Sequence, residues 1–141
     1  MRDKEPVFID SNVLIYGSYG EPQKMERFDA LVKERTLPPV VSTQVLKEFV
    51  NVCLRKKLSR STDELLNRLD KICATFIVRE ISPATIKSAV AVHKRYRYSF
   101  YDSLVIAAAL EYNCRTLYTE DLHDGQVIGK KLRIVNPFSL K

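Results

Sequence analysis

The chain alternates short β-rich runs with longer helical stretches, and this alternation limits its possible folds more than any other feature. Short apolar runs typical of buried strands occur at 7–10, 40–42, 76–78, 115–119 and 133–135. Helices are predicted at 21–35, 43–57, 61–73, 82–97 and 100–113. Strands separated by helices need crossover connections, and we therefore expect an α/β fold: a three-layer, Rossmann-like domain with a central parallel five-stranded sheet.

Length and local signals complete this picture of the fold. With 141 residues and no linker, repeat or low-complexity segment, the sequence predicts a single domain over 1–141. Ser61 and Glu64 have the spacing of a capping box, which predicts a helix start at Ser61. Pro83 suits the first position of the following helix.

Four carboxylates stand in apolar or structurally special positions: Asp10, Glu48, Asp102 and Asp121. Asp10 ends the first strand, Glu48 falls in the second turn of a helix, Asp102 opens an apolar helix, and Asp121 follows the fourth strand. In a parallel sheet with crossover helices, the carboxyl ends of strands and the amino ends of helices share one edge. The connectivity therefore predicts that all four acids converge there.

Asp10 and Glu48 each have a simpler interpretation. Asp10-Ser11-Asn12 has the chemistry of an Asx turn, in which Asp10 would be a turn residue only. Apolar residues on both sides weigh against an unassisted charge at Asp10, because a buried carboxylate is costly without a cation or hydrogen-bond donors. A lone glutamate on a helix, such as Glu48, is more often solvated than functional.

Asp102 and Asp121 also have alternatives. Ser99 and Asp102 have capping-box spacing, and a cap is compatible with a ligand role because a carboxylate has two oxygens. Asp121 lies in a polar turn with Glu120 and Asp124, either of which could take its place.

A site made only of carboxylates suits a hard cation, Mg²⁺ or Mn²⁺. Asp10 and Asp102 are the expected principal ligands, with Glu48 and Asp121 holding a second ion or orienting a metal-bound water. Such a site supports phosphodiester hydrolysis without a nucleophilic side chain. The polar residues expected to support the four acids are Ser11, Asn12, Thr119 and Asp124.

The net charge of +6 and a pI near 9.3 suggest a polyanionic partner. In one basic cluster, Lys94–Tyr98, arginines alternate with tyrosines, a combination able to contact phosphates and stack unpaired bases. Arg95, Tyr96 and Arg97 are therefore candidate RNA-binding residues. The alternative is an ordinary solvated face.

The remaining sequence signals exclude several classes of protein. Cys53, Cys73 and Cys114 have no CxxC spacing, which argues against a disulfide framework or zinc site, and each is expected in the core. The N-terminal residues contain no apolar signal region, and the apolar run 104–110 is too short to cross a bilayer. We expect a cytoplasmic protein.

Four segments together resemble the motifs of PIN-domain nucleases, particularly VapC-type toxins of bacterial toxin–antitoxin pairs. The segments are Phe8–Tyr16, Ser42–Phe49, Tyr101–Ala109 and Leu117–Gln126, the last followed by Asn136-Pro137-Phe138. The resemblance spans nearly the whole chain in the family's order. It implies a five-stranded parallel sheet, an Mg²⁺- or Mn²⁺-dependent ribonuclease, a homodimer, and inhibition by a small antitoxin protein.

Two other functions compete with this interpretation. One is a phosphatase of another Rossmann-like family, in which the first-strand Asp is a covalent nucleophile, but such enzymes usually have a second Asp nearby where this chain has Asn12. The other is a non-catalytic, nucleic-acid-binding PIN domain that has lost its acids, whereas this chain retains four.

Overall fold

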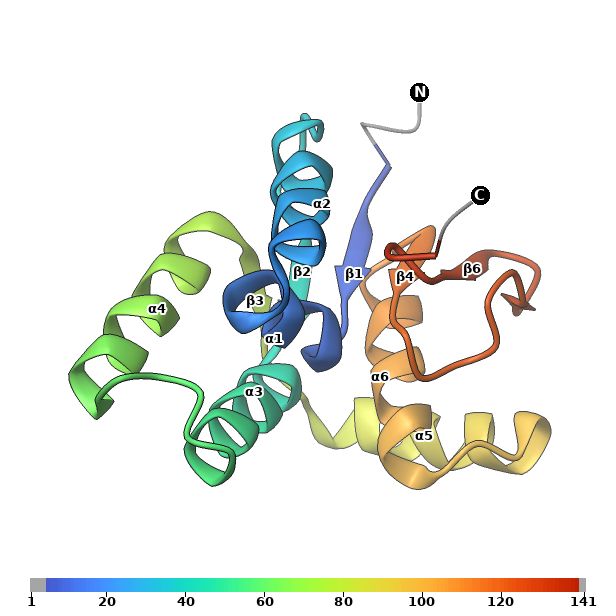
Figure 1. Ribbon diagram of the computed structural model, residues 1–141. Coiled ribbons are helices and arrows are strands. Elements are labelled where there is room, and N and C mark those ends of the chain that lie inside the picture. The colour runs from blue at the N-terminus through green and yellow to red at the C-terminus, as the bar shows by residue number, and fades with distance from the viewer. Residues whose placement is uncertain (1–4, 140–141) are drawn as a thin grey trace.

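The computed structural model describes residues 5–139 and contains one mixed β-sheet (Figure 1). The strand order is β3-β2-β1-β4-β6-β5. The strands are β1 (Val7–Ile9), β2 (Val40–Ser42), β3 (Ile77–Arg79), β4 (Thr116–Tyr118), β5 (Val127–Ile128) and β6 (Leu132–Val135). The predicted α/β class and parallel core are confirmed, since β3, β2, β1, β4 and β6 pair in parallel.

The sheet has one strand more than predicted. The two-residue strand β5 pairs with β6 in the antiparallel direction. The turn between these two strands contains Gly129, which adopts a positive φ of 59°. A two-residue strand is too short to produce an alternating pattern, and the prediction of five strands missed it for this reason.

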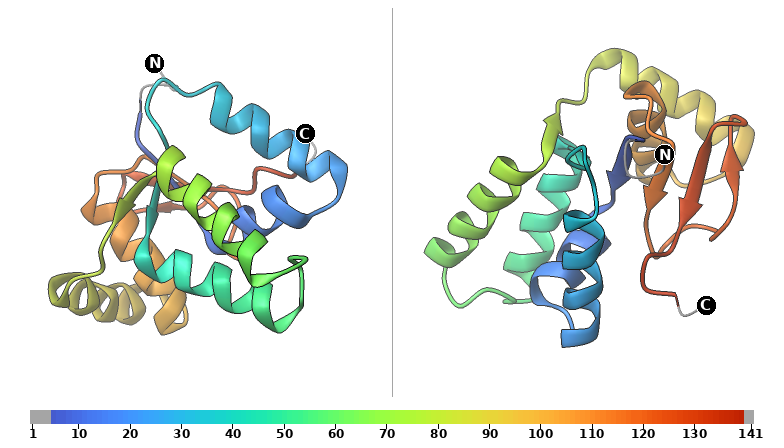
Figure 2. Two further views of the ribbon diagram at one scale, coloured as in Figure 1. Left: turned by 90° about the vertical axis from the view of Figure 1, so that its left-hand side faces the viewer. Right: turned by 90° about the horizontal axis from the view of Figure 1, so that it is seen from above.

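Within residues 5–139, six helices cover the sheet in two layers (Figure 2). The first four lie on one face, and α5 and α6 lie on the other. The helices are α1 (Ser11–Tyr19), α2 (Pro22–Lys33), α3 (Thr43–Arg55), α4 (Thr62–Thr75), α5 (Pro83–Tyr96) and α6 (Phe100–Glu111). Every residue from Ser103 to Ala109 of α6 is buried, as its apolar sequence predicted.

Helix α1 was not predicted, and it packs closely on α2. A Cβ atom at Gly17 would lie 2.4 Å from Cγ of Phe28, so only glycine permits this approach. The helix starts at Ser11, and the side chain of the preceding residue, Asp10, caps it. Because only Asp10 separates β1 from α1, the N-terminus of the helix lies beside the end of that strand.

The local signals were partly correct. Ser61 caps α4 by accepting a hydrogen bond from the Glu64 amide, but the Glu64 carboxylate accepts one from the Tyr19 hydroxyl at 2.7 Å. The reciprocal capping box forms instead at Ser82 and Thr85, where Pro83 is the first helical residue as predicted.

Two of the three cysteines are buried as predicted, namely Cys53 and Cys114, and all three are free thiols. Cys73 is exposed, and its prediction was wrong because it faces outward near the end of α4. No helix in the part of the chain that the structure describes combines the length and apolar composition that a membrane crossing requires.

The strand order creates a topological switch point at one edge of the sheet. Strand β1 pairs with β2 on one side and with β4 on the other, and the chain reverses its direction of travel across the sheet there. The carboxyl ends of β1, β2 and β4 meet the amino ends of α1, α3 and α6 at this edge. Ligands of open α/β sheets bind at such a switch point.

Candidate functional site

Asp10 lies at the centre of this edge, directly after β1. Its side chain is only 4% exposed. Oδ1 accepts a hydrogen bond from the Ser11 amide at 2.7 Å, and Oδ2 accepts one from the Thr119 hydroxyl at 2.9 Å. Asp10 therefore caps a helix, where the simpler interpretation of the sequence had only a turn, and its second oxygen is turned toward Thr119.

Burial raises the pKa of Asp10 from 3.8 to about 7. The hydrogen bonds from Thr119 and Ser11 oppose this change, while the negative charges of Glu48 and Asp121 add to it. Near neutral pH the carboxyl group is thus divided between its protonated and ionised forms. A cation at this position would favour the ionised form.

Thr119 joins Asp10 to the residues around it. Its hydroxyl oxygen accepts hydrogen bonds from the Asn12 amide group and from the Asp121 backbone, both at 3.2 Å. Asn12 Oδ1 accepts a further bond from the Glu120 backbone at 3.1 Å. These contacts attach the start of α1 to the loop that follows β4.

Glu48 lies on α3 and contacts Ser11, the residue after Asp10. Its Oε2 accepts a hydrogen bond from the Ser11 hydroxyl at 2.9 Å, and its Oε1 accepts one from Gln44 Nε2 at 2.9 Å. Gln44 Nε2 also donates to the carbonyl oxygen of Tyr101 at 3.2 Å. Sequence reasoning missed Gln44, although its position one helical turn before Glu48 could have suggested the contact.

Asp102 lies in the first turn of α6 and is partly buried. Its backbone amide donates to the Ser99 hydroxyl at 3.2 Å, which makes Ser99 the helix cap that the spacing predicted. Burial raises the pKa of Asp102, a hydrogen bond with the Ser99 side chain lowers it, and the charge of Asp121 raises it.

The three acids of the loop after β4 have different surroundings. The Glu120 carboxylate forms a salt bridge with Lys24 Nζ at 3.0 Å, and Asp124 Oδ1 accepts a hydrogen bond from the Asn136 amide at 2.9 Å. The charge of Asp121, in contrast, raises the pKa of both Asp10 and Asp102. Asp121 is therefore the acid of this loop that faces the other carboxylates.

The four acids thus lie at one edge and act on one another electrostatically, but they are not tightly gathered. Within residues 5–139, no three His, Cys, Asp or Glu side chains have the spacing needed to hold a metal ion together. The donor chemistry still fits a hard cation, because every group in the cluster is a carboxylate and its most buried member is strongly desolvated.

The predicted RNA-binding residues lie at the end of α5, beside this edge. Tyr96 accepts a hydrogen bond from the Gly129 amide at 3.0 Å, and the Arg95 guanidinium lies 5.4 Å from its ring. Arg97 follows in the left-handed conformation, with a φ of 66°. Arg97 and the two tyrosines around it line a surface hollow of about 740 Å³, together with His123, Asp124, Gly125 and Gln126.

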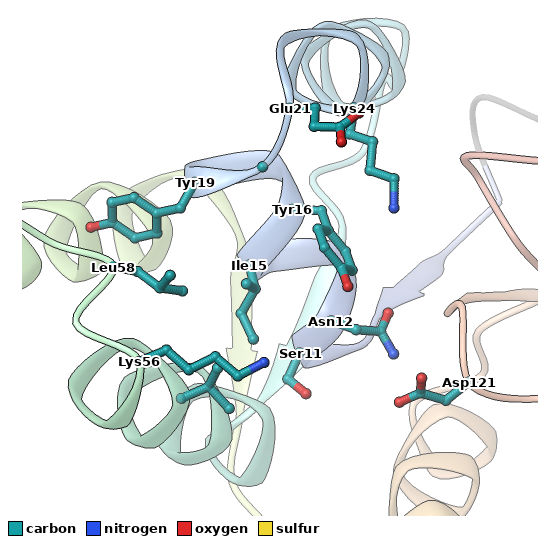
Figure 3. Close-up of a pocket in the computed structure, with 12 residues that line it drawn as sticks. Ser11, Asn12, Ile15, Tyr16, Tyr19, Glu21, Lys24, Lys56, Leu58 and Asp121 are labelled. Atoms are coloured by element: carbon teal, nitrogen blue, oxygen red, sulfur yellow. The ribbon is translucent and has the colours of Figure 1, made fainter.

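A second cleft, of about 580 Å³, has Asp121 in its lining (Figure 3). Ser11, Asn12 and Asp121 form its end at the acidic edge. Its walls come from α1, the start of α2 and the end of α3, and include Ile15, Tyr16, Tyr19, Lys24, Lys56 and Leu58. Of the four acids, Asp121 lines this cleft.

Comparison with known proteins identifies the family. The family model described as the PIN domain matches residues 7–123, which include all four acids. The chain belongs to the PIN-domain family. The expected resemblance is thereby confirmed over most of the chain. The search of curated proteins returned no match.

Solved structures show the same PIN fold at low sequence identity. A toxin–antitoxin complex from Klebsiella pneumoniae superposes with a TM-score of 0.71 at 19% identity, covering 95% of this chain and 99% of that one. VapC20 from Mycobacterium tuberculosis, described as a sarcin–ricin loop cleaving toxin, gives 0.62 at 18% identity and coverages of 82% and 89%. VapBC2 from Rickettsia felis, bound to a promoter DNA fragment, gives 0.62 at 16% and coverages of 82% and 88%.

Proposed function

We propose that this PIN domain is a divalent-metal-dependent endoribonuclease that hydrolyses RNA phosphodiester bonds. One observation carries the proposal: Asp10 is buried at the switch point with a pKa of about 7, and the charges of Glu48 and Asp121 both act on it. A buried acid surrounded by other acids is unfavourable unless a cation binds there. Such clusters are typical of functional sites.

The roles of the four acids follow from their positions. Asp10 and Asp102 are the proposed principal ligands of Mg²⁺ or Mn²⁺, with Glu48 and Asp121 as further ligands or as groups that orient water. When bound, the ion would supply Lewis-acid activation of water and neutralise phosphate charge. Ser11 holds Glu48, and Thr119 holds Asp10 and the backbone of Asp121, so these residues orient the acids before substrate arrives.

The substrate and partners are inferred from charge and from the solved relatives. The net charge of +6 and the basic end of α5 favour a nucleic-acid substrate. The relatives are described as a sarcin–ricin loop cleaving toxin, as a toxin–antitoxin complex and as VapBC2 bound to promoter DNA. We therefore propose a cytoplasmic toxin that a cognate antitoxin protein silences.

A rival function, a phosphatase with Asp10 as covalent nucleophile, has less support. Asn12 stands where such an enzyme would hold its second acid, and both ends of its side chain are engaged, by Thr119 and by the Glu120 amide. The open spacing of the acids favours a second rival, a PIN domain that binds nucleic acid without cleaving it.

Cleavage of total RNA by the purified protein tests the proposal against both rivals. We expect cleavage with Mg²⁺ or Mn²⁺ and none with EDTA. RNA binding without cleavage under all metal conditions would support the non-catalytic alternative. Hydrolysis of small phosphate monoesters with intact RNA would support the phosphatase.

We also propose a homodimer, with a two-fold interface built from helix surfaces that the core leaves exposed. Phe28 and Leu31 of α2 pack on the core and Leu65 of α4 is buried, so these side chains are used within the protomer. Leu66 remains 56% exposed. Sedimentation equilibrium at micromolar concentration should give twice the mass of 16.2 kDa, and a monomer throughout would refute the dimer.

A further inference from the structure

Two large aromatic side chains are exposed directly beside Asp102. Phe100 and Tyr101, the first residues of α6, are 39% and 65% exposed. Their rings contact each other edge to face, with centroids 5.6 Å apart. Most large aromatic side chains of this chain pack against the core, whereas this pair presents its rings to solvent at the acidic edge.

The backbone of this aromatic pair is fixed relative to the acids. Gln44, itself buried, donates from Nε2 both to the Tyr101 carbonyl and to the Glu48 carboxylate. Both partners are acceptors, so the orientation of the Gln44 amide is determined by its contacts. Tyr101 and Glu48 are therefore linked through a single nitrogen atom.

Positively charged side chains precede the pair in the chain. Lys94, Arg95 and Arg97 lie exposed at the end of α5, a few residues before Phe100. Positive charge next to exposed aromatic rings is the combination with which proteins bind single-stranded nucleic acids, through phosphate contacts and base stacking. The bases of a duplex are already stacked and do not offer their faces.

We propose that Phe100 and Tyr101 form a stacking platform for an unpaired base of the RNA, next to the phosphate that is cleaved. This inference rests on the proposed ribonuclease function and adds two residues that hold a base of the substrate. Asp102 is adjacent to Tyr101 in sequence, and the nucleotide on the platform is thus a direct neighbour of the acids.

Fluorescence of 2-aminopurine tests the platform without requiring cleavage. A single-stranded RNA oligonucleotide with this base is titrated with the full chain in EDTA. Stacking on Tyr101 should quench the fluorescence, and Tyr101→Ala should raise Kd roughly tenfold or more. Tyr101→Phe and Tyr101→Trp should bind within about twofold of wild type, because the ring is kept.

Leu37→Ala provides a matched control, because Leu37 is 41% exposed and lies just before β2, at the strand end opposite the acids. Its Kd should equal that of wild type. A duplex of the same sequence should bind equally to wild type and Tyr101→Ala. Equal single-strand affinity of wild type and Tyr101→Ala would overturn the platform.

Two further measurements separate this inference from its alternatives. If wild type binds and quenches the oligonucleotide but never cleaves RNA with metal, the nuclease proposal fails while the platform stands. If wild type cleaves and Tyr101→Ala cleaves single-stranded RNA equally well, the platform fails alone. A change in sedimentation mass for Tyr101→Ala with unchanged RNA affinity would assign the aromatic pair to a protein interface and refute the platform.

Discussion

The two halves of the candidate site hold their acids in different ways. On the β1–β4 side, Asp10 and Thr119 are 4% and 0% exposed, and hydrogen bonds from Ser11 and Asn12 link them to α1. On the α3–α6 side, Glu48 and Asp102 are only partly buried. Asp10 thus meets a dry environment, whereas Glu48 and Asp102 meet a partly wet one.

This difference separates two tasks within one site. Desolvation on the β1–β4 side makes the charge of Asp10 dependent on what binds there. Partial exposure on the α3–α6 side leaves Glu48 and Asp102 accessible to an ion and to substrate. Changes on the buried side should therefore have larger effects than changes on the open side.

Asp10→Asn should have the largest effect on activity. The substitution removes the proposed buried ligand while keeping the size of the side chain, and RNA cleavage should fall by more than about a hundredfold. Initial rates on RNA with Mg²⁺ measure it. Near-normal metal-dependent cleavage would remove Asp10 from the proposed site and leave it as a helix cap.

Without metal, the protein should become less stable as pH rises from about 4 to about 7. The folded state raises the pKa of Asp10 above its ordinary value of 3.8, so folding binds a proton. This stabilisation is complete below pH 4 and is lost as pH passes about 7. Its size is at most about 4 kcal/mol.

Urea unfolding in EDTA across this pH range measures the loss, with Asp10→Asn as the control. The variant cannot ionise at this position, and its stability should vary much less with pH. Equal pH dependence in both proteins would mean that Asp10 has an ordinary pKa in the folded state.

Thr119→Val should come next in its effect on activity. It removes the hydroxyl that donates to Asp10 and accepts from Asn12 and the Asp121 amide. The hydrogen bond from Thr119 lowers the pKa of Asp10, so its loss should move the acidic limb of the pH–rate profile to higher pH.

At pH 7 we expect kcat/KM of Thr119→Val to fall roughly 10- to 100-fold, with partial recovery at higher pH. Thr119→Ser keeps the hydroxyl and should remain close to wild type. A loss that is the same at every pH would show that Thr119 acts through packing alone.

Gln44→Met tests the open side and should have the smallest effect, roughly tenfold at saturating metal. It removes the amide that holds Glu48 and the Tyr101 carbonyl but preserves the length of the side chain. Asn51→Met, at an exposed position of α3, is the control. A larger loss for Gln44→Met than for Thr119→Val would reverse the ranking of the two halves.

Much of the fold could be predicted because the strands are buried and short. Val40–Ser42 was placed at its observed limits, and its three residues are all buried. Helix α1 was missed because its buried residues, Val13, Leu14, Gly17 and Ser18, include two that carry no hydrophobic signal. Its packing depends on the Phe28 ring against Gly17, a long-range contact that no local pattern encodes.

For the site, connectivity alone located the edge, because strand and helix directions decide where each residue lies. The selection of Asp121 over its neighbours required atomic contacts, since Glu120 and Asp124 have the same chemistry and differ only in their partners, Lys24 and Asn136. The position of Gln44 was visible in the sequence, but its second contact, with Tyr101 on another helix, was not.

The left-handed backbone of Arg97 has a thermodynamic consequence for the end of α5. Glycine occupies this conformation without penalty, whereas a residue with a Cβ atom is disfavoured there by about 1 kcal/mol. Arg97→Gly should therefore make the domain more resistant to unfolding while depriving the hollow at the end of α5 of a positive charge. At this one position, the residue best for folding and the residue best for holding a polyanion are different.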